Sequence, residues 1–400
     1  MNRILAWALF DLANTFFAVA MLSFHFPLWI VEERGGRELS FSMALGASMA
    51  CVAILMPFCG ALSDATGERM RFLRWTTYGC TAATLLVSLA SQLGTALVLF
   101  GVANVCYQLG TVFYDAVLWE IAPQGRIGQT SGVGAAFGYL GSMVGLLLLW
   151  PFVRAGGHQA AFAPSAVFFL IFAFPCFLAI QEATTGKRVG WGTLVHAAVT
   201  RLTTTVRSAK RLGHLWRYLW SSFFSLNAIN TVLVFMAVYT KKVAGFSEDE
   251  VIRFFVFSQL FAIAGSLLLT RLIPRLGSKR TLEWIWFGWM AALTLALGDL
   301  SVRWLWVVGP LIGFFLGSTW ATSRVLVIEL SPPGQLAELL GLAGLFGRAS
   351  SIIGPLLWGV LVWDPARSRH AILALIGLLA LGIWLLHGVT PRPPGRERIT

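Results

Sequence analysis

Long apolar runs constrain the fold of this 400-residue chain more than any other feature of its sequence. A helix needs about 20 mostly apolar residues to span a bilayer. Strands of a membrane barrel have only about 10 residues and alternate in polarity, which these runs do not. Only 12% of the residues are charged, against about 25% in soluble proteins, so the chain cannot cover a water-facing surface. We therefore predict an all-α polytopic membrane protein with twelve transmembrane helices. The predicted spans are Ile4–Val31, Phe41–Leu62, Phe72–Ser91, Leu97–Ile121, Ile127–Val153, Ala160–Ile180, Leu215–Thr240, Val251–Leu272, Leu282–Leu300, Trp304–Leu330, Leu336–Trp363 and Ala371–Val389.

The basic residues are unevenly distributed over the predicted loops. If the N-terminus is cytoplasmic, 19 of the 30 Lys and Arg residues lie on the cytoplasmic side. Cytoplasmic loops of membrane proteins accumulate such residues. We therefore expect both termini in the cytoplasm of a protein of the bacterial inner membrane. The net charge of +12 follows from this bias, so we expect no nucleic-acid partner.

The sequence also contains an internal repeat. At a constant offset of 209 residues, Glu120 falls on Glu329, Gly138 on Gly347 and Ser142 on Ser351. Two parallel six-helix halves, related by an axis along the membrane normal, are the arrangement of the major facilitator fold. The predicted domains are an N-terminal six-helix bundle over 1–181, a cytoplasmic linker with an amphipathic helix over 182–214, a C-terminal six-helix bundle over 215–389 and a cytoplasmic tail over 390–400.

Several motifs resemble a known transporter family. Residues 60–71 (GALSDATGERMR) resemble the signature loop between the second and third spans of the major facilitator superfamily. Residues 7–15 (WALFDLANT), 114–123 (YDAVLWEIAP) and 347–355 (GRASSIIGP) look like the vacuole-effluxer-like family of that superfamily. The resemblance implies transport. Eukaryotic members are associated with amino-acid export from the vacuole, whereas the substrates of bacterial relatives are largely unassigned. Phe16 departs from the family pattern, which favours a small residue there.

Four charged residues lie deep inside predicted spans, away from the span ends, where a charge costs at least about 2.5–3.5 kcal/mol and therefore marks a functional candidate. At 1.5 Å per residue, Asp11, Asp115 and Arg324 lie in one layer ~9–10 Å from the cytoplasmic end, and Arg348 lies ~18 Å deep. Asp115 and Arg324 are repeat equivalents, so the axis would place them on opposite cavity walls. We predict that this layer contacts substrate or exchanges a salt bridge during gating, with Asp11 as a proton site. A permanent ion pair is the alternative for the layer and for Arg348.

Polar residues extend both groups of candidates. Uncharged side chains in cavity-lining spans are candidates for substrate or coupling, although such groups more often form interhelical hydrogen bonds; they are Asn14, Tyr114, Asn227 and Asn230. Residues near the cytoplasmic span ends are predicted to form a gating latch; they are Asp64, Arg69, Arg71, Glu120 and Glu329. His25, near the other end of the first span, is predicted to be a packed or interfacial histidine rather than a proton relay.

These features predict a secondary active transporter that moves a small polar organic solute, an amino acid or a similar molecule, by alternating access. We expect the protein to export its solute, and we expect this export to be coupled to a proton or a cation. A lipid or lysolipid transporter of the same fold is the alternative. The sequence has no catalytic cluster and no phosphate-binding Gly-x4-Gly-Lys motif, so we expect neither an enzyme nor an ATP-driven pump. None of the five cysteines has metal-ligand spacing, so we expect no metal and no cofactor. We expect a monomer whose partners are its substrate and the membrane lipids.

Overall fold

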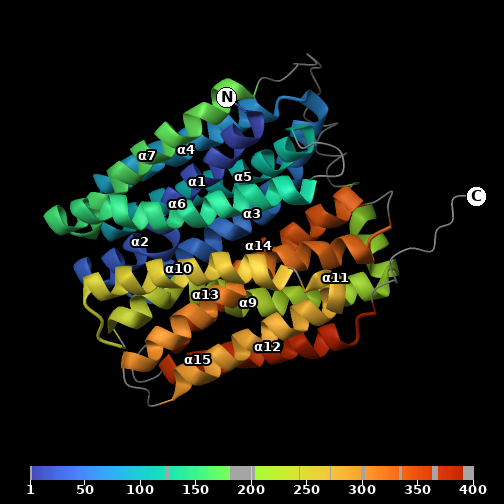
Figure 1. Ribbon diagram of the computed structural model, residues 1–400. Coiled ribbons are helices and arrows are strands. Elements are labelled where there is room, and N and C mark those ends of the chain that lie inside the picture. Colours follow the sequence, from blue (N-terminus) through green and yellow to red (C-terminus); the bar gives the residue numbers. More distant parts are fainter. Residues whose placement is uncertain are drawn as a thin grey trace, which may run out of the picture. The chain divides into compact units, whose positions relative to one another are not determined.

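A computed structural model of the protein describes residues 2–121, 127–180, 200, 203–242, 244–270, 272–298, 302–332, 336–362 and 368–390 (Figure 1). Within these ranges the secondary structure consists of helices alone. The prediction of an all-α chain is therefore confirmed. The predicted amphipathic linker helix falls mainly on 181–199, which lie outside the described residues, while residues 203–211 are helical.

In the described ranges, six long helical segments precede the linker and six follow it. The first begins as α1 (Arg3–Phe17) and continues through a π-helical segment (Ala18–Ser23), α2 (His25–Leu28) and a second π-helical segment (Trp29–Glu33). The other helices before the linker are α3 (Glu38–Thr66), α4 (Arg69–Ser88), α5 (Leu93–Ile121), α6 (Ile127–Gly156), the short 3-10 helix η3 (His158–Ala161) and α7 (Phe162–Ala179). The helices after it are α9 (Gly213–Lys242), α10 (Glu248–Thr270), the short α11 (Ile273–Leu276), α12 (Ser278–Leu297), α13 (Val302–Leu330), α14 (Leu336–Leu361) and α15 (Ser368–His387).

Ten of these segments are long and apolar enough to cross a membrane. The remaining two, α4 and α12, have 20 residues each, which is also enough to span the bilayer core. Each of them carries three charged residues in its first two turns, which lowers its apolar character. These residues are Arg69, Arg71 and Arg74 in α4, and Lys279, Arg280 and Glu283 in α12.

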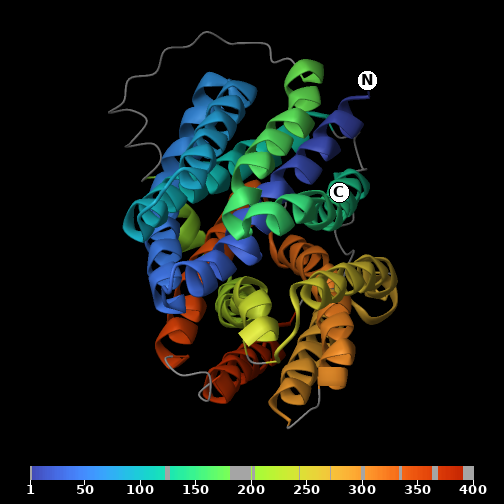
Figure 2. The ribbon, with the colours of Figure 1, turned by 90° about the vertical axis from the view of Figure 1, so that its left-hand side faces the viewer.

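The helix bounds follow the repeat found in the sequence. Advancing α4 and α5 by 209 residues gives the bounds of α12 and α13, and the same shift carries the first residue of α6 onto that of α14. The packing repeats too, because α4 contacts α5 and α7 while α12 contacts α13 and α15. Figure 2 shows these pairs as neighbouring ribbons. The duplication therefore extends from residue identities to helix ends and helix partners.

Small residues bring α6 unusually close to α1. A Cβ atom added at Gly141 would lie 2.5 Å from the Leu12 carbonyl oxygen, and one added at Gly134 would lie 2.6 Å from the Trp7 ring. Glycine is therefore required at both positions for the two helices to reach this separation. Small residues at such contacts let the backbones of membrane helices approach closely.

We expect Gly141→Ala to destabilise the protein by about 1–3 kcal/mol, because overpacking a tight contact forces backbone shifts of that cost. Gly145→Ala, one turn further along α6, is the matched control, since its added Cβ would meet the Phe16 ring at an ordinary 3.5 Å. Thermal unfolding in detergent would compare the two variants. Equal midpoints for them would contradict the close approach of α6 to α1.

The chain divides into two compact units. Unit 1 comprises 1–200, 232–256 and 355–365, and unit 2 comprises 201–231, 257–354 and 366–400. Unit 1 thus contains the helices before the linker together with the end of α9, the start of α10 and the end of α14. The predicted division at residues 181 and 215 follows the sequence repeat and stays a prediction.

Candidate functional site

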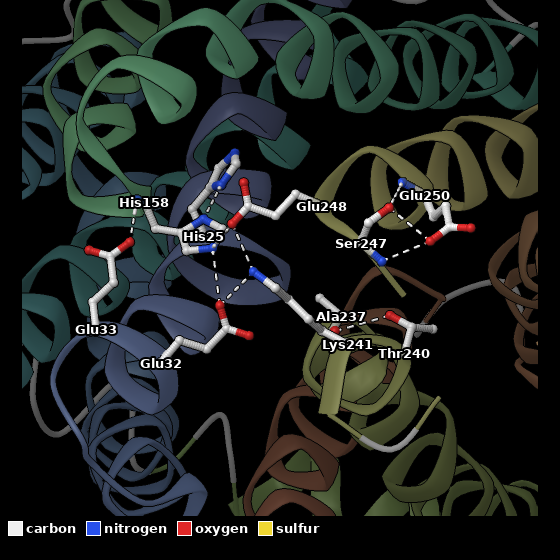
Figure 3. A network of polar contacts seen from close by, with 10 residues as sticks. All are labelled: His25, Glu32, Glu33, His158, Ala237, Thr240, Lys241, Ser247, Glu248 and Glu250. Atoms are coloured by element: carbon white, nitrogen blue, oxygen red, sulfur yellow. Dashed lines mark hydrogen bonds and ion pairs between the residues drawn. The ribbon is translucent and has the colours of Figure 1, made fainter. Parts of the chain in front are cut away.

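A network of polar side chains lies in unit 1, at the end of the first span that is distant from the N-terminus (Figure 3). We call it the Lys241 cluster; its members are His25, Glu32, His158, Lys241 and Glu248. They come from the start of α2, the second π-helical segment, the start of η3, the end of α9 and the start of α10. Residues from both repeats therefore meet in one cluster.

Lys241 bridges two carboxylates. Its Nζ atom lies 2.6 Å from Glu32 Oε2 and 2.8 Å from Glu248 Oε1. The Lys241 side chain is 17% exposed, against 23% for Glu32 and 40% for Glu248. Glu32 and Lys241 are 209 residues apart, which is the offset of the repeat. This ion pair therefore joins two equivalent positions that carry opposite charges.

Two buried histidines lie beside this ion pair. His25 is fully buried and His158 is 2% exposed. Their Nδ1 atoms are 3.1 Å apart, so one ring donates a hydrogen bond and the other accepts it. The Nε2 atom of His158 lies 3.8 Å from both Glu32 Oε2 and Glu248 Oε1 and has no hydrogen-bond partner among the described residues. The burial of His25 agrees with its predicted packed role.

Local backbone features place these side chains. Gly157, at a φ of +75°, ends α6 and starts the turn into η3; this left-handed conformation favours glycine. The Glu33 carboxylate then accepts a hydrogen bond from the backbone N–H of His158 at 2.6 Å, which fixes the start of η3. At α10, Ser247 and Glu250 form a reciprocal capping box, so Glu248 stands in the first turn of that helix.

At the same end of unit 1, aromatic and polar side chains form contacts between the two repeats. We call these contacts the seam. Phe24 packs on Phe255, and Phe235 contacts both Phe41 and Trp358. Polar bonds link α3 to α14: Trp358 Nε1 donates to Glu38 Oε2 at 2.5 Å, and Ser42 Oγ donates to the Pro355 carbonyl at 2.7 Å. Arg154 and Asp249 add an exposed ion pair at 2.9 Å. The two repeats are thus held together here by contacts that side-chain motion can break.

The predicted substrate and coupling residues of the first repeat lie on α1 and α5. Asn14 and Tyr114 are buried, and the Tyr114 ring stacks on Trp7 with the centroids 4.5 Å apart. Asp11 is half-buried, and its carboxylate lies against Gly138, where an added Cβ would be 2.9 Å from Oδ2. Asp115 is exposed. These residues share unit 1, but their roles stay predictions.

The corresponding residues of the second repeat lie in unit 2. Asn227 accepts a hydrogen bond from the Gly354 N–H at 2.8 Å and donates to the Phe223 carbonyl at 2.8 Å. Asn230 donates to the hydroxyl groups of Ser350 and Ser351. Both amides therefore join α9 to α14. Of the two predicted arginines, Arg324 is exposed and Arg348 is half-buried.

The residues predicted to form a latch lie at the helix ends next to the N-terminus of α4 and of α12. Arg69 donates to the Ala116 carbonyl of α5 at 3.3 Å. Its repeat equivalent, Ser278, donates to the Glu329 carboxylate of α13. Arg71 pairs at 2.9 Å with Glu68, the residue that precedes α4 as its N-cap. Asp64 and Glu120 belong to α3 and α5, but their side chains lie outside the described part of the chain.

Sequence reasoning singled out only His25 among the members of the Lys241 cluster and missed the other four. The predicted first, seventh and eighth spans stop short of Glu32, Lys241 and Glu248, which the hydropathy pattern therefore assigns to loops. Helical backbone nevertheless continues through all three residues. The repeat could have indicated this pair. Glu32 and Lys241 occupy equivalent positions and have opposite charges, so they are candidates for an ion pair between the repeats.

The fold is that of the major facilitator transporters. The nucleoside transporter NupG aligns with a TM-score of 0.76 at 11% identity, covering 97% of this chain and 100% of that chain. The human organic anion transporter MFSD10 aligns with a TM-score of 0.70 at 17% identity, covering 96% and 98%. At such low identity these likenesses show the fold alone. They confirm the predicted fold class. Together with the ten long apolar helices, this fold is that of an integral membrane protein.

The sequence identifies the family within that class. Residues 37–396 match the family described as "Vacuole effluxer Atg22 like", so the chain belongs to that family. The Bacillus subtilis MFS-type transporter YxiO is 24% identical over 401 residues, covering 95% of this chain and 93% of that protein. Autophagy-related protein 22 of Pichia angusta is 28% identical over 184 residues, covering 43% and 32%. The predicted family resemblance is confirmed: the chain is a transporter of a small molecule and not an enzyme.

Proposed function

We propose that the protein is a secondary active transporter that moves a small polar organic solute, such as an amino acid, by alternating access. The observation that carries this proposal is the exposure of Asp115 and Arg324 within helices of membrane-spanning length. A charge facing hydrocarbon is costly, so such residues line a water-filled cavity or pair inside the bundle. The sequence repeat predicts equal depths for this anion and this cation, and such an arrangement would suit a zwitterionic solute.

The Lys241 cluster supports the alternating-access part of the proposal. Glu32 and Lys241 are repeat equivalents of opposite charge, and they pair directly at 2.6 Å. Asp115 and Arg324 have the same relation in the sequence. A rocking transporter needs contacts between its repeats that form in one state and break in the other. We assign that role to the Lys241 cluster and the seam around Phe235, which close one side of the pathway.

We further propose that the cluster lies on the outer side of a bacterial inner membrane and that proton or cation coupling drives export. The excess of basic residues in the loops predicted to lie on the same side of the membrane as the N-terminus supports this orientation. A reporter inserted near Gly36 is expected outside, whereas one near Gly190 and one after Thr400 are expected in the cytoplasm. A cytoplasmic signal at Gly36 would reverse the assignment.

Flux measurements in reconstituted vesicles test the proposed function. Vesicles containing the full chain would be loaded with labelled amino acids or other polar solutes, with and without a pH gradient. We expect gradient-dependent movement of a water-soluble solute, which Asp115→Asn abolishes. If labelled lysolipid is translocated and none of the polar solutes is, this proposal is wrong and the protein is a lipid transporter of the same fold.

A further inference from the structure

We propose that Glu32, His158 and Glu248 form a binding site for a divalent transition-metal ion such as Zn²⁺. One nitrogen atom and two carboxylate oxygen atoms of these residues lie within 4.8 Å of one another. Imidazole and carboxylate groups are both ligands of Zn²⁺, and a site with three protein ligands completes its coordination with water. The exposed side of Glu248 gives water access to that fourth position.

The distances suit such a site after a small movement. In tetrahedral coordination, with zinc–ligand bonds of about 2.0–2.2 Å, neighbouring ligand atoms are about 3.3 Å apart. His158 Nε2 is 3.8 Å from each of the two carboxylate oxygens. Since all three ligand atoms lie within 4.8 Å of one another, metal binding requires rotations of the two glutamate side chains toward the imidazole.

The buried imidazole is the observation that separates this site from an ordinary acidic cluster. His158 is 2% exposed, and its Nε2 atom points between the two carboxylates without a hydrogen-bond partner in the described residues. A buried polar atom of this kind normally has a partner. Its other nitrogen lies 3.1 Å from His25 Nδ1. When His158 Nδ1–H donates this hydrogen bond, the ring orientation is fixed and Nε2 is left as a metal ligand, the effect that an outer-shell contact has on a metal-binding histidine.

Lys241 occupies the site in the described conformation. Its ammonium group lies between the two carboxylates, 2.6 Å from one and 2.8 Å from the other, so both already converge on one cation. A metal ion and Lys241 compete for the same oxygen atoms and exclude each other. Lys241 stands in the last turn of α9, and its flexible side chain can leave toward solvent when the metal enters.

Metal binding would join the first-repeat residues Glu32 and His158 to Glu248 of the second repeat. The metal thereby stabilises the arrangement in which these segments meet. If the proposed function is correct, Zn²⁺ added outside therefore inhibits transport. Zinc binding itself does not depend on the proposed function. A zinc titration therefore tests the metal site, and a flux measurement separately tests the transport function.

Zinc titration of the full chain in detergent tests the site. We expect one Zn²⁺ per chain in the wild type and at least about tenfold weaker binding in His158→Gln and in Glu32→Gln. Lys241→Met should bind Zn²⁺ at least about tenfold more tightly, because the competing cation is gone. His387→Gln is the matched control: His387 lies 3.8 Å from a single carboxylate, Glu283, and is 87% exposed, so its loss should leave the affinity unchanged.

Two results would overturn the proposal. One is wild-type zinc affinity in His158→Gln, which would reveal an adventitious surface site only. The other is a folded Lys241→Met variant without any gain in affinity. If Lys241→Met does not fold, the absorption spectrum of bound Co²⁺ decides the question. The wild type should give the intense visible bands of a tetrahedral site, and His158→Gln should lose them; identical spectra would contradict the assignment.

Discussion

Lys241→Met is expected to weaken the contact between the repeats by about 1–3 kcal/mol and to slow transport about tenfold. Breaking a buried ion pair by removing one partner costs about 3–5 kcal/mol, whereas exposed pairs contribute about 0–1 kcal/mol. The Lys241 cluster lies between these cases, because its lysine is 17% and Glu248 40% exposed. A change of 1.4 kcal/mol shifts a two-state equilibrium about tenfold. Unfolding midpoints and flux rates measure the two effects.

Two further variants separate this effect from a general loss of charge. Arg154→Gln removes an ion pair whose side chains are 61% and 51% exposed, so it should cost no more than about 1 kcal/mol. Adding Glu32→Gln and Glu248→Gln to Lys241→Met removes the unpaired carboxylates and should recover stability, because residues in contact couple by about 0.5–3 kcal/mol. A triple variant as unstable as Lys241→Met alone would contradict the ion-pair explanation.

Asp115→Asn and Arg324→Gln are each expected to abolish transport or to reduce it strongly. If these repeat equivalents pair with each other, as Glu32 pairs with Lys241, the loss of one leaves the other without that partner. That loss costs about 3–5 kcal/mol for a fully buried pair and less for side chains that are exposed in the described structure, as these two are. Folding yield and flux of the reconstituted variants would measure the effect. Wild-type flux in either single variant would remove this layer from the mechanism.

The double variant distinguishes the two roles proposed for the layer. It contains no unpaired charge, so folding should recover whether the pair is a latch or a substrate site. A latch predicts that transport recovers as well. A substrate site predicts that transport stays lost, because the groups that recognise the solute are gone. Our proposal requires the second result.

The fold was predictable because apolarity and helical structure coincide over most of this chain. The predicted spans Leu97–Ile121 and Trp304–Leu330 end at the same residues as α5 and α13. A bilayer imposes this coincidence, since every backbone polar group in hydrocarbon must be satisfied within a helix. The 209-residue offset also relates the bounds of α4 to those of α12, although the sequence matches that revealed it lie in later spans.

The candidate site was less predictable, because it is formed by the polar ends of otherwise apolar helices. Glu32 and Lys241 end their helices with charges, so a hydropathy criterion places them in loops although they form a partly buried pair. His158 follows Gly157, and nothing in the local sequence indicates that its ring is buried against His25. Asn227 and Asn230 were found from their polarity inside a span, but only the structure shows their bonds to α14.

A reversible disulfide across the seam is the most direct test of alternating access. A Cβ atom at Gly359 would lie 2.7 Å from Ser42 Oγ and 2.9 Å from the Leu39 Cα atom. A cysteine there must shift α14 slightly against α3, which leaves the two Cβ atoms within reach of a disulfide, about 3.5–4.5 Å; the Gly359→Cys single variant controls for this shift. Ser42→Cys and Gly359→Cys would be combined after the five native cysteines are replaced by alanine, with each single cysteine as a control. The oxidised double variant should lose transport and regain it on reduction. Full transport by the cross-linked protein would contradict the proposal that this side of the pathway must open.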